Sequence, residues 1–475
     1  MKKIIVICQK IIVMALNSKN PVSVFKAIIG AIQEVSEAGF NGIVFPKMEY
    51  HIKPFQHGSH CTIPTDFTID FQYSSMYVED NEFCTSEINK GYNLFEFGHY
   101  DFNADPIRIP CHNSTFKNLY FYGERWSAEH ENSYYTEFVT AFEFSTADVY
   151  NCHLENVIFN STVGFNIGYN QNGFQQWQGT SKDGAVRGCV RYTDFSAGKL
   201  AEDGVTVEEN DGWYCTPEYL KLGFFYDATD YTGMKKYKVG RMNTATDYGL
   251  DSRWYEIFFF DEEKNLIDYR THQMTLETYD LPENTVYFKV NAMFTSAPTA
   301  SSEGKVDVPH VIRLWTSADP DQCYISNCKF INPHASAISI CGGTNCVIRN
   351  CYAEQGAIFK NPNGALFGWS IDYEDGWQAM RHNILYGTMC SGYLVMPGGH
   401  NTAIVNCVIK RMTNGSEQEL AKVINSAVAE VVLGTKTNNR LENVTYGSLN
   451  TNSKHTSVAT TRIINCNSES VSKLF

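Results

Sequence analysis

The segment from Gly368 to Trp377 gathers the side chains best suited to acid–base chemistry in this sequence. It places three carboxylates, Asp372, Glu374 and Asp375, close together along the chain. In a strand, alternate residues project to the same side, so Asp372 and Glu374 would lie side by side while Asp375 enters the turn. Adjacent carboxylates raise one another's pKa, which gives a hydrolase both an acid and a base near neutral pH.

Two further features extend this candidate catalytic site. Trp369 and Trp377 flank the carboxylates and would form aromatic walls that offer a sugar platform. Gly398-Gly399-His400-Asn401 follows later in the sequence and could bring His400 to the same side. Two other interpretations stay open: a solvated acidic turn with a His that satisfies backbone groups, and sugar binding without cleavage. Lyase chemistry ranks lower because no acidic calcium cluster with a nearby Lys/Arg pair is evident.

A four-residue frame sets the elements that would position these residues. The frame is apolar, any residue, Asn, then apolar or Cys, and its Asn residues are Asn118, Asn156, Asn327, Asn350, Asn406, Asn443 and Asn465. Its spacing indicates rungs of about 22 residues, some lengthened by loops. Asn tolerates the left-handed conformation that a tight bend needs, and stacked Asn side chains can hydrogen-bond along a ladder. The repeat therefore predicts an all-β fold, a parallel β-helix.

The N-terminal part has a different pattern. Apolar residues at helical spacing run from Phe25 to Val35, with Gly39 placed to end a helix and a strand expected over 42–45. Such a helix would cap the open end of the core, as repeat proteins require. Residues 4–16 form an apolar stretch after a charged start, interrupted at Gln9 and Lys10; a signal peptide, a start at Met14 and a first strand are all open.

The opening resembles a known superfamily. Phe25 to Gln33, Gly42-Ile-Val-Phe-Pro46 and Tyr50-His-Ile52 are similar to the start of pectate-lyase-like proteins, which include many phage tail spikes. With the rungs, the resemblance covers about residues 20–170 and 310–475, although the Gly/Asp-rich segment that usually precedes the helix is absent. It implies a right-handed parallel β-helix, a homotrimer, other tail proteins as partners, a bacterial surface polysaccharide as ligand, and a place in the virion after synthesis in the host cytoplasm.

The candidate site is similar to that of the polygalacturonase group of β-helix enzymes. In that group an Asp pair and a Gly-His-Gly motif lie on successive rungs, which here match Asp372, Asp375 and His400. Asn401 replaces the final Gly, the expected Asn-x-Asp is missing, and Arg411 loosely matches a later Arg-x-Lys. The resemblance implies a glycoside hydrolase with Asp372, Glu374, Asp375 and His400 as catalytic residues and Trp369, Trp377 and Arg411 as substrate-binding residues.

The region 175–310 lacks the Asn frame and has longer alternating strands. Val286 to Phe294 alternates apolar with polar residues, as a half-buried strand does, and 254–267 reads as a hairpin. We therefore expect an inserted antiparallel β-sandwich, similar to the jelly-roll-type modules of phage tail and carbohydrate-binding proteins. The predicted domains are an N-terminal segment 1–20, a first β-helix part 21–174 with its capping helix, the insertion 175–310, and a second β-helix part 311–475.

Composition excludes several classes of function. The formal net charge is −14 and the basic residues are scattered, which disfavours nucleic acid and any polyanion held by charge alone. The 15 cysteines include no C-x-x-C pair and no zinc spacing, so we predict no metal or cofactor and expect buried free thiols in a reducing cytosol. No apolar run is long enough to cross a membrane.

These observations predict a phage tail-spike-like protein that binds a bacterial surface polysaccharide and, in the catalytic alternative, hydrolyses it. Two other interpretations remain: a non-catalytic glycan-binding adhesin or structural tail protein, and a secreted bacterial polysaccharidase.

Overall fold

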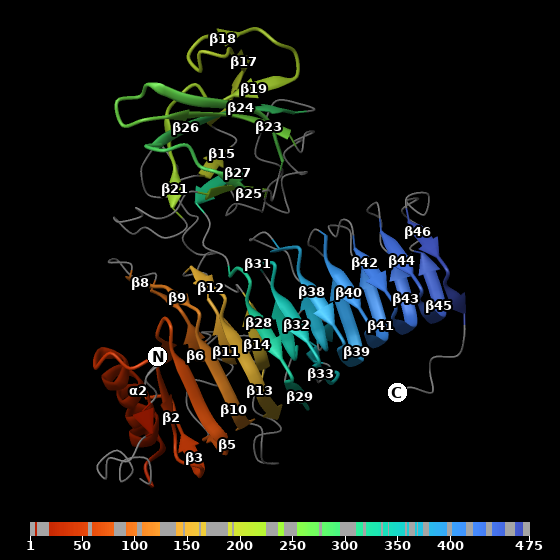
Figure 1. Cartoon of the computed structure of the whole chain (residues 1–475). Helices are drawn as coiled ribbons and strands as arrows, with labels where there is room; N and C mark the ends of the chain where they lie inside the picture. The colour runs from red at the N-terminus through yellow and green to blue at the C-terminus, as the bar shows by residue number, and fades with distance from the viewer. Residues whose placement is uncertain are drawn as a thin grey trace.

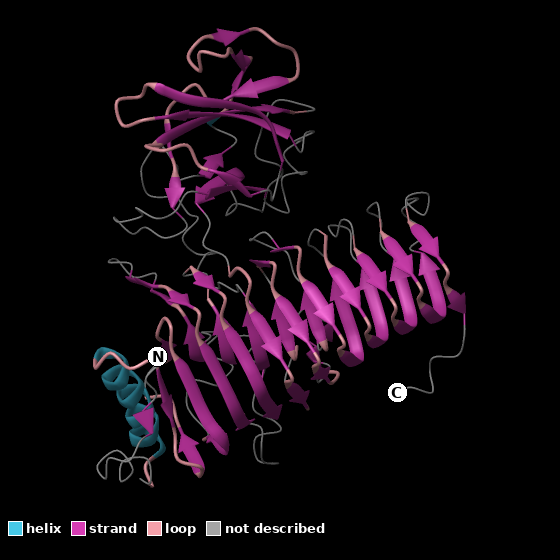
Figure 2. Cartoon of the chain, viewed as in Figure 1, coloured by secondary structure: helices cyan, strands magenta, loops and turns pink. Residues whose placement is uncertain are grey.

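The computed structural model is built almost entirely from β-strands (Figures 1 and 2). It describes residues 5–6, 19–55, 59–79, 92–101, 107–123, 139–145, 148–160, 163–167, 189–191, 194–224, 236–241, 254–274, 278–294, 310–316, 320–333, 336–340, 342–356, 359–360, 366–367, 369–373, 380–396, 401–414, 421–433, 439–451 and 461–468. None of the helices in these ranges is long and apolar enough to span a membrane.

A right-handed parallel β-helix forms the main body, with 26 strands in one continuous network of mostly neighbouring parallel pairs. Its rungs turn at corners that divide this network into three faces. Face 1 contains β2 (Gly42–Val44), the first parts of β5 (Thr68–Val78), β10 (Thr115–Tyr122) and β13 (His153–Asn160), then β28 (Tyr324–Ser326), β32 (Val347–Arg349), β38 (Ile384–Tyr386), β40 (Ala403–Val405), β42 (Lys422–Ile424), β44 (Arg440–Glu442) and β46 (Arg462–Ile464). β1 (Ile5–Val6) pairs with β2 and extends this face by one strand.

The other two faces follow the same order of rungs. Face 2 contains β3 (Glu49–Ile52), the second parts of β5, β10 and β13, β29 (Lys329–Ile331), β33 (Tyr352–Ala353), the first parts of β39 (Met389–Met396), β41 (Val408–Asn414), β43 (Ala427–Leu433) and β45 (Thr445–Thr451), and β47 (Asn467–Ser468). Face 3 contains β4 (Cys61–Ile63), β6 (Tyr92–Phe97), β11 (Val139–Phe144), β14 (Val163–Ile167), β30 (Ile338–Ile340), β36 (Ile371–Tyr373) and the second parts of β39, β41, β43 and β45.

The predicted Asn bends are confirmed at the corner between faces 1 and 2, which we call the Asn corner. The seven Asn residues of the frame all have φ between 50° and 61°. Their side chains bond from rung to rung: Asn118 Nδ2 donates to Asp70 Oδ1 at 2.9 Å, and Asn156 Nδ2 donates to Asn118 Oδ1 at 3.1 Å. On most of the later rungs the next position carries Cys, Ser or Thr, whose side chain donates to the carbonyl two residues earlier, as Cys351 and Ser426 do. Leu119, Val157 and Val444 occupy it on the other rungs and belong to the core.

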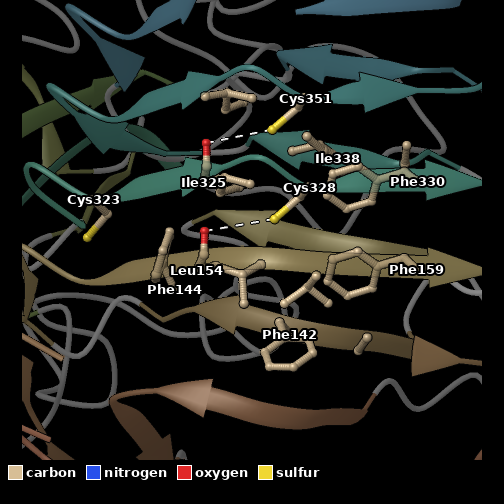
Figure 3. Close-up of a cluster of buried hydrophobic side chains, with 14 of the residues drawn as sticks. Phe142, Phe144, Leu154, Phe159, Cys323, Ile325, Cys328, Phe330, Ile338 and Cys351 are labelled. Carbon is tan, nitrogen blue, oxygen red and sulfur yellow. Dashed lines mark hydrogen bonds between the residues drawn. The ribbon is translucent and has the colours of Figure 1, made fainter. Parts of the chain in front are cut away.

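Inward-facing side chains of the three faces stack into one apolar core. Figure 3 shows part of it, where the rings of Phe159 and Phe330 on adjacent rungs stack at 4.7 Å. Each such buried side chain contributes about 1.5–3 kcal/mol. The cysteines whose side chains the structure describes are free thiols, as expected, and all of them but Cys466 are buried. Burial raises the pKa of Cys328 and Cys390, so these thiols stay protonated and unreactive.

The predicted capping helix is α2 (Pro21–Glu37), which packs on the first rung at one end of the coil (Figure 1). The Asn20 side chain accepts hydrogen bonds from the amides of Val22 and Ser23, which satisfies the first turn. Gly39 follows the helix with φ 79°, a conformation that favours glycine. Its buried face includes Phe25, Ile28 and Ile32, and this face closes the end of the core.

Between β14 and β28 the chain forms the predicted β-sandwich. One sheet contains β15 (Cys189–Arg191), β21 (Gly223–Phe224), β22 (Lys236–Arg241), β25 (Thr278–Asp280) and β27 (His310–Thr316); the other contains β16 (Ser196–Ala197), β19 (Trp213–Cys215), β20 (Leu220–Lys221), β23 (Trp254–Phe260), β24 (Leu266–Met274) and β26 (Tyr287–Met293). The pairings are antiparallel except that of β21 with β27, and β23 and β24 form the expected hairpin. Residues from both sheets share one core.

The expectation that 286–294 is half buried was wrong at Lys289 and Asn291, on the side of the strand predicted to be polar. Lys289 and Asn291 are as buried as their apolar neighbours. The segment with β17 (Lys199–Leu200) and β18 (Val207–Glu208) covers them: Lys289 Nζ donates to the Gly204 carbonyl at 3.0 Å, and Asn291 exchanges hydrogen bonds with Leu200. A second layer outside the sheet thus buries its polar side.

Candidate functional site

Face 3 carries the described part of the predicted site. Trp369 lies two residues before β36, Asp372 lies at the centre of β36, and Arg411 lies in β41 two rungs further along. The other predicted residues, Glu374, Asp375, Trp377 and His400, lie outside the described residues. The structure thus brings three of the predicted residues to one face of the coil.

Asp372 projects to the outer side of face 3, because Ile371 and Tyr373 on either side of it belong to the core. Its neighbours in register on the adjacent rungs are Ser339 and Val395, so neither rung places a second carboxylate beside it. Asp372 is only 9% exposed. Any catalytic partner must therefore come from residues other than these register neighbours.

A row of four side chains crosses successive rungs at the start of face 3. We call it the Trp–Tyr–Arg–Glu row: Trp369, Tyr393, Arg411 and Glu430. The rings of Trp369 and Tyr393 lie 6.0 Å apart at 35°, and the Arg411 guanidinium lies 4.9 Å from the centre of the Tyr393 ring. Arg411 Nε lies 3.5 Å from Glu430 Oε2. The row combines two aromatic rings, a fork of hydrogen-bond donors and a carboxylate acceptor.

Backbone contacts hold Tyr393 in this position. The Gln355 Oε1 atom accepts a hydrogen bond from the Tyr393 amide at 2.9 Å, and the Ser370 amide donates to the Tyr393 carbonyl at 2.9 Å. Ser370 Oγ also accepts from the Gly392 amide. A side chain at Gly392 would meet Gln355 Oε1 at 1.9 Å, so only glycine allows this approach. The sequence analysis missed Tyr393, because only the register of β39 with β36 and β41 aligns it with Trp369 and Arg411.

Asn401, the departure from the Gly-His-Gly motif, has a structural role at another corner. It lies between faces 3 and 1 with φ 56°, and its Nδ2 atom lies 2.7 Å from His382 Nδ1. Asn113, Asn151 and Asn345 occupy the same corner with left-handed conformations. The Asn at 401 is thus part of a second corner ladder, which the sequence analysis did not recognise.

Face 3 also holds a pair of carboxylates that the sequence analysis missed. Glu96 in β6 and Glu143 in β11 are partners in register on adjacent rungs. Their Cα atoms are therefore separated by about one strand spacing, about 4.8 Å. They are only 7% and 4% exposed. The register therefore places two buried acidic side chains on neighbouring strands of the same face.

Similarity to known proteins is found among solved structures. No family model matches the sequence, and no curated protein matches it. The chain is similar to the structure of PfbA, a surface adhesin of Streptococcus pneumoniae, with 11% identity over 95% of this chain and 91% of that chain and a TM-score of 0.35. It is also similar to tailspike protein 3 of bacteriophage CBA120, with 11% identity over 95% of this chain and 60% of that chain and a TM-score of 0.29. For the A-module of the Azotobacter vinelandii mannuronan C-5 epimerase AlgE6, the identity is 9% over 96% of this chain and 98% of that chain, and the TM-score is 0.29. At such identities the likeness concerns the fold alone.

Proposed function

We propose that this chain binds an extended polysaccharide along the Trp–Tyr–Arg–Glu row. The observation that carries the proposal is the arrangement of Trp369, Tyr393, Arg411 and Glu430 across successive rungs of one face. Aromatic rings stack on the apolar faces of sugars, while Arg and Glu exchange hydrogen bonds with hydroxyl groups. The side chains repeat at the strand spacing of about 4.8 Å, which suits a polymer running along the coil.

The electrostatics favour a neutral polymer. The net charge of −14 repels polyanions, and the Arg411 charge is offset by Glu430. Both side chains are about one third exposed, at 35% and 36%, so they remain accessible to a ligand. Affinity then comes from stacking and hydrogen bonds, and it should depend little on salt.

The biological setting proposed here rests on the resemblance of the opening segment to phage tail spikes. In that setting the protein is a homotrimeric virion appendage that contacts other tail proteins and recognises a polysaccharide on the bacterial surface. A secreted bacterial polysaccharidase is the alternative. The limits of the insertion, 175 and 310, and a carbohydrate-binding role for it also stay predictions.

Hydrolysis by Asp372, Glu374, Asp375 and His400 stays a prediction beside this proposal. The low exposure of Asp372 favours binding over cleavage, because a general acid must reach the glycosidic oxygen. Binding without cleavage would make the protein an adhesin.

The test uses the full chain and a panel of bacterial capsular and cell-wall polysaccharides. We expect the wild type to bind one or more of them and a Trp369→Ala/Arg411→Ala variant to bind at least about 10-fold more weakly, since stacking and guanidinium contacts are both lost. Tyr386→Ala is the matched control, because Tyr386 is a 44% exposed aromatic residue on face 1. Equal binding by the double variant and the wild type would refute the proposal.

The same panel tests cleavage. Product release by the wild type that is lost in Asp372→Asn would establish the hydrolase. Binding with no products from the wild type would leave the row as an adhesive surface.

A further inference from the structure

Two imidazoles and a carboxylate converge at the N-terminal end of face 3. His60 directly precedes β4, Glu96 lies in β6, and His99 begins the short strand β7 (His99–Asp101). His99 Nδ1 lies 2.5 Å from Glu96 Oε2, and His60 Nε2 lies 4.0 Å from the same oxygen. One potential ligand atom from each residue lies within 4.8 Å of the other two. Three donors on two adjacent rungs thus face a common point.

The local backbone is shaped to make this convergence. Gly98 has φ 73°, which turns the chain after β6 and returns His99 over Glu96, three residues earlier. A side chain at Gly98 would meet Val149 Cγ2 at 2.9 Å and the Ile109 carbonyl at 3.1 Å. The turn continues into an antiparallel pair of β7 with β8 (Ile107–Ile109), which fixes His99 opposite Ile109. The position of His99 is therefore set by the fold.

The imidazole rings of His60 and His99 stack at 3.7 Å, so the two histidines are held together from different rungs. Both are partly exposed, with side chains 22% and 19% accessible, while Glu96 is buried. Glu143 on the next rung adds a second buried carboxylate beside Glu96. This negative charge attracts a cation to a point that solvent can still reach.

Sulfur does not contribute to this cluster. Cys61 follows His60, but its side chain is fully buried in the core of the coil and so points away from the cluster. The donor set is therefore two imidazole nitrogens and one carboxylate oxygen, which suits zinc and similar transition metals, whereas calcium and magnesium prefer oxygen ligands.

We propose that His60, Glu96 and His99 form a binding site for one divalent transition-metal ion of the zinc class. The ion would replace the hydrogen bond between His99 and Glu96, and His60 would approach by a small rotation, because such ligands lie about 2.0–2.2 Å from zinc. Water would complete the coordination. An ion held there would link the first two rungs through their side chains. The sequence showed no zinc spacing because the ligands meet only when β4 and β6 stack.

The test measures zinc binding to the full chain after chelator treatment and dialysis. Titration calorimetry and elemental analysis should give one zinc ion per chain in the wild type. His60→Ala and His99→Ala should each weaken binding at least about 10-fold, while Glu96→Gln, which keeps the shape of the side chain, should do the same without disturbing the fold. Calcium and magnesium should give no comparable binding.

His51→Ala is the matched control, because His51 Nδ1 lies 2.5 Å from Glu79 Oε1 but, among the described residues, the pair belongs to no cluster of three possible ligands. It should bind zinc as the wild type does. Zinc should also raise the melting temperature of the wild type and of this control, and not that of His60→Ala, because only the native state holds the ligands together. Glycan is absent from these measurements, so their outcome is separate from that of the polysaccharide assay.

The proposal fails if the wild type binds less than one equivalent of zinc, or if Glu96→Gln and the two His variants bind as tightly as the wild type. Either result would make the cluster a hydrogen-bonded link between rungs.

Discussion

The Asn corner and the Trp–Tyr–Arg–Glu row are both built from one residue per rung, yet they differ in what repeats. At the Asn corner nearly every rung has the same residue type in the same left-handed conformation, with side chains bonded to one another. In the Trp–Tyr–Arg–Glu row each rung contributes a different chemical group. Repetition of one residue marks architecture, and a change of residue on a regular scaffold marks the place where a ligand can be recognised.

The largest effect that would sharpen this comparison is expected at Gly387, the position in the Asn corner that has glycine in place of Asn. Its φ is 56°, and a Cβ there would meet Asn350 Oδ1 at 2.8 Å. Gly387→Val should therefore destabilise the chain by about 3 kcal/mol, because a β-branched residue is especially unfavourable in the left-handed conformation. Gly387→Asn restores the residue of the other rungs and should cost far less.

Urea unfolding monitored by circular dichroism would measure the free energy of unfolding of both variants. Polysaccharide binding by the folded fraction should be unchanged. If Gly387→Val is as stable as Gly387→Asn, the corner does not constrain the backbone as described.

A smaller effect, on polysaccharide affinity instead of stability, is expected at Tyr393. Tyr393→Ala removes the ring on which Arg411 lies and next to which Trp369 packs, so polysaccharide affinity should fall about 10-fold, or about 1.4 kcal/mol. The urea midpoint should change little because the ring is only partly buried. A loss of stability with unchanged affinity would place Tyr393 with the architecture.

The smallest effect is expected at Glu430. Glu430→Gln removes the charge beside Arg411 but keeps the shape and a hydrogen-bond acceptor. Because partly exposed ion pairs contribute little, affinity for a neutral polysaccharide should fall by about two-fold or less. The same variant should improve binding of an acidic polysaccharide at low salt, which a binding assay at two ionic strengths would detect. No difference between the two polymers would show that charge plays no part in the row.

The repetition itself explains why the fold was accessible from the sequence. The Asn frame predicted the corner because the left-handed backbone conformation there favours Asn on most rungs. The frame did not include the rungs at Gly387 and Asn425, where Thr388 and Ser426 stand in place of the expected apolar residue or Cys. Any small donor serves there, since Thr388 and Ser426 bond the carbonyl two residues earlier as the cysteines do.

The candidate site was only partly accessible. Trp369 was identified from the local pattern around the carboxylates, and Arg411 from the resemblance to the polygalacturonase group. Tyr393 stands among small and apolar residues, and only the register of β39 places it beside the other two. Glu96 and Glu143 likewise come from separate rungs joined by long connections. Side chains that meet across a parallel sheet leave no fixed spacing in the chain, because each connection between rungs has its own length.

The pairing of β13 with β28 has a consequence for biosynthesis. Leu154 and Ile325 are neighbours in the ladder, and the whole insertion is translated between them. The nascent β-helix therefore leaves the ribosome with an unpaired parallel edge and an open apolar end at Phe159. Both stay exposed until β28 and β29 have been synthesised and have paired with β13. Long-range pairing of this kind is slow and exposed to aggregation. The junction across the insertion is the point at which the growing chain depends most on rapid sandwich folding or on chaperones.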